Sequence, residues 1–160
     1  MNKIFQTRLF ILLFILNSII YSSHACAADY EPLPGTIFTL IKALTIPDKA
    51  TSVYIQNKIA TRDERLIDQY YANCLFEQHD LAKGEKVIPP DKFIVTKTML
   101  SREYSAVNSF KFITLFYLTS HSNKKEYTLE CQHWGELYDN YLTREQIQET
   151  LKVYFVINDQ

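Results

Sequence analysis

The fold of this chain is decided by residues 110–134, which read FKFITLFYLTSHSNKKEYTLECQHW. Two stretches rich in β-branched and aromatic residues flank the polar segment 120–125, and this pattern predicts a long antiparallel hairpin. Side chains on one side of such a hairpin form cross-strand pairs. If Leu118 pairs with Tyr127, the other pairs predicted on that side are Phe116 with Leu129, Thr114 with Cys131 and Phe112 with His133. Cys131 then points into an aromatic core.

Four further stretches are rich in β-favouring residues and are predicted to be strands: residues 38–46, 52–56, 70–77 and 92–99. The first also fits helical spacing, but its two threonines favour the strand. Pro47 and Asp48 have turn chemistry, so the first two strands are expected to form a hairpin. The polar loop 78–90, which contains Gly84 and Pro89-Pro90, marks a turn within one domain.

The end of the chain changes from a strand pattern to a helix pattern. Thr143 and Gln146 form a capping-box sequence, and Ile147, Leu151 and Tyr154 follow at helical spacing. We expect this short helix to close the fold, with its apolar stripe covering a sheet; a partner-binding face is the alternative. The predicted class is therefore mainly β, an antiparallel sheet or small β-sandwich with one short C-terminal helix.

The first 27 residues predict an export signal. Lys3 and Arg8 precede an apolar run of about 13 residues, which is too short to span a membrane, since a spanning helix needs about 20. Ala25 and Ala27 fit an A-x-A cleavage site, which would leave 133 residues beginning at Ala28. We expect residues 1–27 to be a signal peptide, 28–35 a flexible lead and 36–160 one domain, in a periplasmic or secreted protein.

Lipidation of Cys26 is an alternative that would attach the chain to a membrane. A lipoprotein signal normally has an aliphatic residue three positions before the cysteine, and Ser23 stands there. Cleavage after Ala27 is therefore favoured over an anchor.

Removal of the signal leaves two cysteines, Cys74 and Cys131, and an even count suits an oxidising compartment. Cys74 shares a strand face with Phe76, so both thiols can enter one interior and a disulfide is geometrically reasonable. Two alternatives use the same sulfurs. One is a zinc site with His79 and His133, whose spacing does not match structural zinc sites, and the other is a cysteine nucleophile, which would have to stay reduced.

Charge and aromatic content bear on partners and on the core. Without Lys3 and Arg8 the chain has 15 basic and 18 acidic residues, a net charge of −3, which argues against nucleic-acid binding. Of its 22 aromatic residues, 18 remain in the 133-residue mature chain. That supply is enough to build a compact core.

No residue constellation specifies a reaction. The chain has no G-x-S-x-G, H-E-x-x-H, P-loop or G-x-G-x-x-G motif. His121 is expected in a solvated turn and His133 at the rim of a strand. Three glutamates are interpreted as exposed strand or loop charges: Glu77, Glu130 and Glu136. No catalytic, cofactor-binding or metal-binding residue is assigned.

Several short motifs resemble those of a group of small exported proteins of Gram-negative bacteria. The resemblance spans most of the mature chain and rests on residues 53–57 (VYIQN), 73–77 (NCLFE), 88–93 (IPPDKF), 129–134 (LECQHW) and Leu142-Thr143. It implies a setting in the cell envelope and a disulfide between Cys74 and Cys131. It carries over no activity and no catalytic residue.

Two hypotheses of function follow. The first is a non-catalytic envelope protein that binds an envelope protein or another envelope component through a sheet face or edge; inhibition of an extracellular hydrolase is one variant. Four tyrosines could form such a surface or pack against the core: Tyr70, Tyr71, Tyr138 and Tyr141. The second is an envelope polysaccharide or peptide hydrolase with unidentified carboxylates, which requires a concave pocket with two facing acidic groups.

Overall fold

The hairpin predicted at residues 110–134 is formed by strands β8 (Ser109–Ser120) and β9 (Glu126–Gly135). The computed structural model describes residues 34–106 and 108–158, so the predicted signal peptide and residues 28–33 of the lead lie outside the described part. All four predicted cross-strand pairs of this hairpin are confirmed. A slip by one residue would turn the buried side outward, so this register keeps the apolar side chains on the core face.

The hairpin is the centre of an eight-stranded antiparallel sheet in the order β10-β1-β7-β8-β9-β5-β3-β4. A separate two-stranded sheet pairs β2 with β6. The bounds of the other elements are β1 Ile37–Leu40, β2 Leu44–Ile46, β3 Ser52–Gln56, β4 Ile59–Thr61, a 3₁₀ turn Glu64–Leu66, β5 Asn73–Gln78, β6 Lys86–Ile88, β7 Asp91–Ala106, α2 Arg144–Leu151 and β10 Phe155–Asn158. The mainly β class with one short helix near the C-terminus is confirmed.

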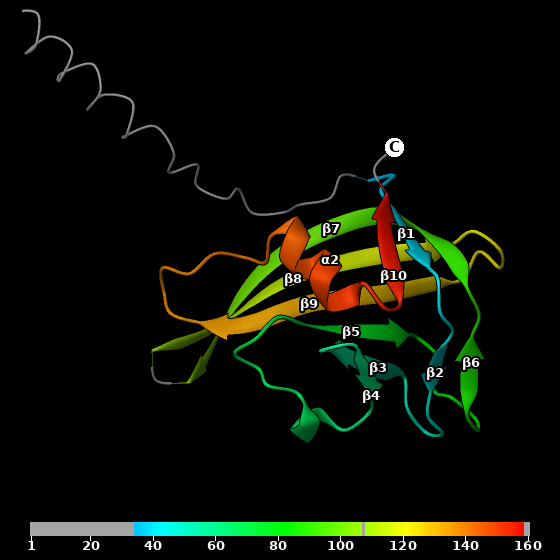
Figure 1. Cartoon of the computed structure of the whole chain (residues 1–160), viewed down its shortest axis with the longest axis horizontal. Coiled ribbons are helices and arrows are strands. Elements are labelled where there is room, and N and C mark those ends of the chain that lie inside the picture. The colour runs from blue at the N-terminus through cyan, green and yellow to red at the C-terminus, as the bar shows by residue number, and fades with distance from the viewer. Residues whose placement is uncertain (1–33, 107, 159–160) are drawn as a thin grey trace, which may run out of the picture.

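The large sheet curls around the core, and helix α2 lies against its inner side (Figure 1). The helix contacts β10 near one edge of the sheet and β3 and β5 near the other. It thus covers the apolar interior between the two halves of the curled sheet. Thr143 and Gln146 form the predicted capping box, and Ile147 and Leu151 are fully buried, so the predicted lid is confirmed.

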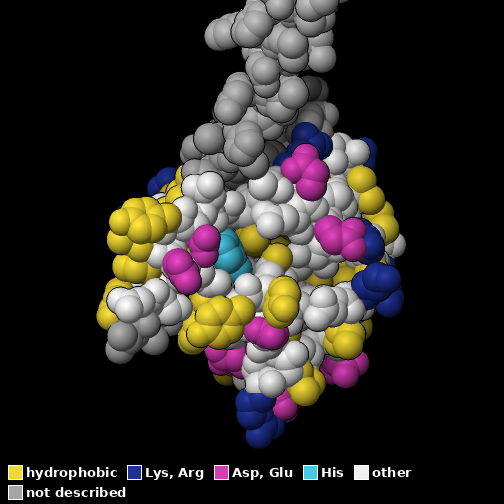
Figure 2. Space-filling view, turned by 60° about the vertical axis from the view of Figure 1, so that its left-hand side comes forward, with side chains coloured by type: hydrophobic (Ala, Val, Ile, Leu, Met, Phe, Trp, Pro, Cys, Tyr) yellow, Lys and Arg dark blue, Asp and Glu magenta, His cyan; other side chains and the backbone are white. Residues whose placement is uncertain are grey.

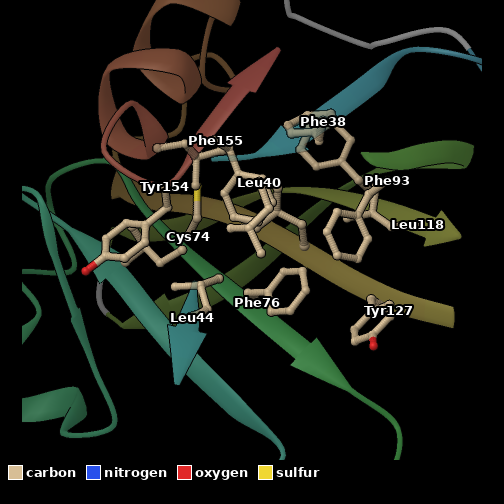
Figure 3. Packing of buried hydrophobic residues seen from close by; sticks show 14 of the residues in the cluster. Phe38, Leu40, Leu44, Cys74, Phe76, Phe93, Leu118, Tyr127, Tyr154 and Phe155 are labelled. Atoms are coloured by element: carbon tan, nitrogen blue, oxygen red, sulfur yellow. The ribbon is translucent and has the colours of Figure 1, made fainter. Parts of the chain in front are cut away.

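Aromatic rings fill the core between the sheet and the helix (Figure 3). Phe76 lies at its centre, with ring centroids 5.6 Å from Phe93, 5.3 Å from Tyr127 and 5.7 Å from Phe155. All four side chains are buried. Part of the aromatic supply noted in the sequence therefore forms one contiguous interior, and the rest lies at or near the surface.

The predicted strand 38–46 and its hairpin with 52–56 are wrong. Residues 41–43 are exposed and separate β1, which pairs with β7 and β10, from β2, which pairs with β6. The predicted turn at Pro47 and Asp48 is present, with Ala50 N donating to Pro47 O at 3.2 Å, but it does not join a hairpin. Asp48 also holds a distant loop, because its Oδ1 accepts a hydrogen bond from Gly84 N at 2.7 Å. Strand β3 pairs with β4 and β5.

The ends of three other predicted elements also differ. Strand β5 begins at Asn73 rather than at Tyr70, because the preceding loop is tied down by the buried side chain of Gln56, which donates to Asp68 O at 2.8 Å. Strand β7 runs to Ala106, well beyond the predicted 92–99. The helix ends at Leu151 and does not close the fold, since β10 follows and returns to pair with β1.

The outer edge of β10 is covered by side chains of α2. Gln148 donates from Nε2 to Phe155 O at 3.1 Å and accepts at Oε1 from Ile157 N at 2.8 Å, as a neighbouring strand would. Such a cap removes an open edge that could pair with another chain. Within the part of the chain that the structure describes, no helix is long and apolar enough to cross a membrane.

Candidate functional site

Exposed apolar side chains gather where the β7–β8 hairpin ends and the chain leaves β9. Tyr104 on β7 and Phe110 on β8 are cross-strand partners, with ring centroids 5.5 Å apart and an interplanar angle of 74°. Together with residues of the loop after β9 they surround a hollow of about 390 Å³. We call this site the aromatic hollow, and its lining residues are Tyr104, Asn108, Phe110, Glu136, Leu137 and Tyr138.

The side chains around the hollow face solvent to an unusual degree. Tyr138 is 90% exposed, Tyr104 67% and Leu137 43%. Figure 2 shows this end of the molecule, where hydrophobic side chains lie beside acidic ones and a histidine. Clustered exposed aromatic residues are a recurrent feature of binding surfaces, whereas single ones are common everywhere.

A tight turn fixes the loop that carries Leu137 and Tyr138. Glu136 N donates to Asp139 Oδ2 at 2.7 Å, and Asp139 N donates to Glu136 O at 3.1 Å. Gly135 precedes this turn, and a Cβ atom at that position would lie 2.3 Å from Asp139 Oδ2. A side chain at this position would therefore force the Asp139 side chain to move.

Arg102 joins the hairpin to the same loop. Its guanidinium carbon lies 5.6 Å from the centre of the Phe110 ring, a cation–π geometry. Its Nη1 also donates to Leu137 O at 3.4 Å. The two walls of the hollow are therefore connected by a side chain that is itself held in place.

A layer of rings supports this end of the sheet. His133 stacks on Phe112 with centroids 5.3 Å apart at 16°, and Tyr141 meets Phe112 edge-on at 5.7 Å. Burial lowers the pKa of His133, with an opposing contribution from the charge of Asp139. His133 is therefore a neutral packing residue at pH 7, in agreement with its predicted rim position.

The four candidate tyrosines have separate positions. Only Tyr138 lines the aromatic hollow; Tyr141 packs on Phe112, and Tyr70 packs edge-on against Trp134 at 5.7 Å. Tyr71 lines a different groove beside α2. The sequence analysis missed Tyr104 and Phe110. The signal that could have found them is one aromatic residue on each side of a short polar turn, which is typical of paired rings at the end of a hairpin.

The three candidate glutamates are also in different environments. Glu77 accepts a hydrogen bond from Thr51 at 3.1 Å, and Glu130 forms an ion pair with Lys111 at 2.9 Å. Glu136 is exposed and lines the aromatic hollow. His79 is exposed at the end of β5, and His121 is exposed in the β8–β9 turn as predicted.

A larger groove of about 640 Å³ lies beside α2 and bears on the hydrolase hypothesis. It contains two carboxylates, Glu145 and Glu149, but both come from the same helix, one turn apart. The remaining lining residues are Asn57, Lys58, Tyr71, Ala72, Gln146 and Thr150, so the wall opposite the helix contributes no acidic group. Glu149 also pairs with Lys152. This groove does not show the facing pair that the hypothesis requires.

Cys74 and Cys131 form a disulfide bond with an S–S distance of 2.07 Å. They are cross-strand partners on β5 and β9, and both are buried. Neither sulfur is then a thiolate, so the zinc and cysteine-nucleophile alternatives do not describe this oxidised state. Among the described residues, no group of three or more His, Cys, Asp or Glu side chains is placed to hold a metal ion.

The aromatic hollow is thus a partly apolar surface site with one carboxylate among its lining residues, at the end of the sheet. No family model matches the chain, and no curated protein or solved structure shows a significant match to it. Comparisons with known proteins therefore do not assign the chain to a family.

Proposed function

We propose that this chain is an exported, non-catalytic protein of the cell envelope that binds a protein partner through the aromatic hollow. The observation that carries the proposal is the set of exposed aromatic side chains around a 390 Å³ hollow, with Tyr138 90% exposed. Tyrosine offers a large contact area at low conformational-entropy cost, which is why it is enriched at interfaces.

The architecture supports a binding role for this site. The hollow is built on paired strands and a hydrogen-bonded turn, so the backbone that carries its side chains is already in place before binding. The buried disulfide and the predicted signal peptide both favour an oxidising compartment outside the cytoplasm.

Site-specific photo-crosslinking in the native host would test the binding proposal. A photoreactive phenylalanine analogue replaces Tyr138 in the full-length protein, and the same analogue at His121, exposed in the turn at the other end of β8, is the control. We expect a discrete crosslinked product from position 138 that is absent from position 121. Equal products at both positions, or none at position 138, would contradict the proposal.

The proposed location has its own test, the intact mass of the protein recovered from its cell envelope. A mass that begins at Ala28 and lacks two hydrogen atoms is expected for the processed, disulfide-bonded form. A mass that retains Cys26 with acyl chains would show instead that the chain is a lipoprotein.

A further inference from the structure

We infer that the aromatic hollow accepts a cationic side chain, lysine or arginine, presented by the protein partner. The inference rests on the proposed function and adds the chemistry that the site recognises. It combines two observations at the hollow, the arrangement of its rings and the single carboxylate on its rim.

Three aromatic rings contribute to the lining: Tyr104, Phe110 and Tyr138. The face of an aromatic ring carries negative electrostatic potential, and ring clusters bind ammonium and guanidinium groups for this reason. Phe110 already shows this behaviour inside the protein, since the guanidinium of Arg102 lies 5.6 Å from its ring centre. The strongly exposed rings of Tyr104 and Tyr138 remain accessible to a cation from outside.

Glu136 adds a full negative charge to the rim. It is the only lining residue that is charged at neutral pH, and among the described residues no cation pairs with its carboxylate. Of the two nearby basic residues, Lys111 pairs with Glu130 at 2.9 Å. Arg102 contacts the lining of the hollow itself, because its guanidinium lies over Phe110 and donates to Leu137 O, so it brings one positive charge to the wall. Asp139, whose Oδ2 accepts from Glu136 N at 2.7 Å, places a second carboxylate beside Glu136, so acidic groups outnumber basic ones at this end.

Charge favours a basic side chain over other occupants, and the hollow, at about 390 Å³, has room for one. A phospholipid ammonium headgroup would bring its phosphate beside Glu136, and the repulsion would oppose binding. A neutral sugar could stack on the tyrosines but would make no use of the negative charge.

An NMR titration of the disulfide-bonded mature protein tests the inference with two small probes of similar size. Nα-acetyl-lysine methylamide carries the cation, and Nα-acetyl-norleucine methylamide is its neutral analogue. We expect the lysine probe to shift the ring signals of Tyr104 and Tyr138 saturably, several-fold more tightly than norleucine, and to weaken as salt is added. Glu136→Gln should reduce affinity for the lysine probe by roughly two- to fivefold, as for an exposed ion pair.

Glu85→Gln is the matched control, because Glu85 is also exposed but does not line the hollow. It should leave the lysine affinity unchanged. Equal binding of the two probes, or equal loss of lysine affinity in both variants, would overturn the inference. Binding to phosphatidylethanolamine vesicles without binding of the lysine probe would overturn it in favour of a lipid. If the crosslink at position 138 persists while the lysine probe fails, the proposed function stands and only its cationic ligand is wrong.

Discussion

Loss of the Cys74–Cys131 disulfide should remove a large part of the stability of this domain. The bond closes a loop of 57 residues in sequence separation. The chain-entropy model gives about 4 kcal/mol for cross-linking a loop of that length, against a total of roughly 5–15 kcal/mol for a typical domain. Both side chains are buried in the core, so substitution by alanine adds a packing loss to the entropic one.

Two double variants separate these contributions. Cys74→Ala/Cys131→Ala removes the cross-link and the sulfur volume, whereas Cys74→Val/Cys131→Val removes the cross-link but restores most of the volume with a residue favoured in strands. We expect the valine variant to lose about 4 kcal/mol and the alanine variant more than that. Wild-type protein unfolded with a reductant should resemble the valine variant.

Urea unfolding measures the effect, and Trp134, the only tryptophan of the chain, supplies the fluorescence signal. The slope of the unfolding free energy against urea should also rise without the cross-link, because the unfolded chain then exposes more surface. A loss below about 1 kcal/mol in the valine variant would refute the loop-closure argument. Two titratable thiols in denatured, unreduced wild-type protein would refute the disulfide itself.

Three further predictions concern the sheet end and the β10 edge. Gly135→Ala should cost about 1–3 kcal/mol because its Cβ would lie 2.3 Å from Asp139 Oδ2. Asp139→Ala in the same chain should recover part of that loss, measured as the free energy of unfolding in urea. If the effects of the two substitutions simply add, the Cβ does not collide with Asp139. Gln148→Ala should cost about 1–2 kcal/mol and speed amide exchange at Ile157, because both edge hydrogen bonds disappear; unchanged exchange would contradict the cap. Burial lowers the pKa of His133 in the folded protein. As the pH falls, the imidazole is therefore protonated in the unfolded chain before it is protonated in the folded one, and the free energy of unfolding should decrease from pH 7 to pH 5. In His133→Phe, urea unfolding should show a smaller decrease of the unfolding free energy over this pH range. The same pH dependence in variant and wild type would contradict the prediction.

Local sequence patterns determined the parts of the fold whose partners are close in the chain. The β8–β9 hairpin followed from two β-rich stretches around one polar turn, and the helix start followed from the pairing of Thr143 with Gln146. Each is a short-range arrangement, so propensity and side-chain period carry the necessary information. The pairing of the cysteines was also accessible, because only two remain after the signal and both lie on core-facing positions.

The arrangement of distant segments could not be read in the same way. The break between β1 and β2 depends on their separate pairing with β7 and β6, and the return of β10 to pair with β1 joins residues more than 100 positions apart. A short apolar strand matches many edges equally well, since backbone hydrogen bonding is the same for all of them. Tertiary packing decides which edge it joins.

The candidate site shows the same division. Exposed tyrosines and Glu136 were visible in the sequence as separate candidates, and Tyr138 among them is confirmed as a surface residue of the hollow. Their convergence with Tyr104 and Phe110 was not visible, because it requires the long β7–β8 hairpin to bring its end beside the turn after Gly135. The sequence by itself thus determined the β class, the central hairpin and the helix cap, and it made the disulfide a reasonable pairing. Only the tertiary structure decided which rings and which carboxylate share one hollow, because that depends on distances between segments that no local pattern encodes.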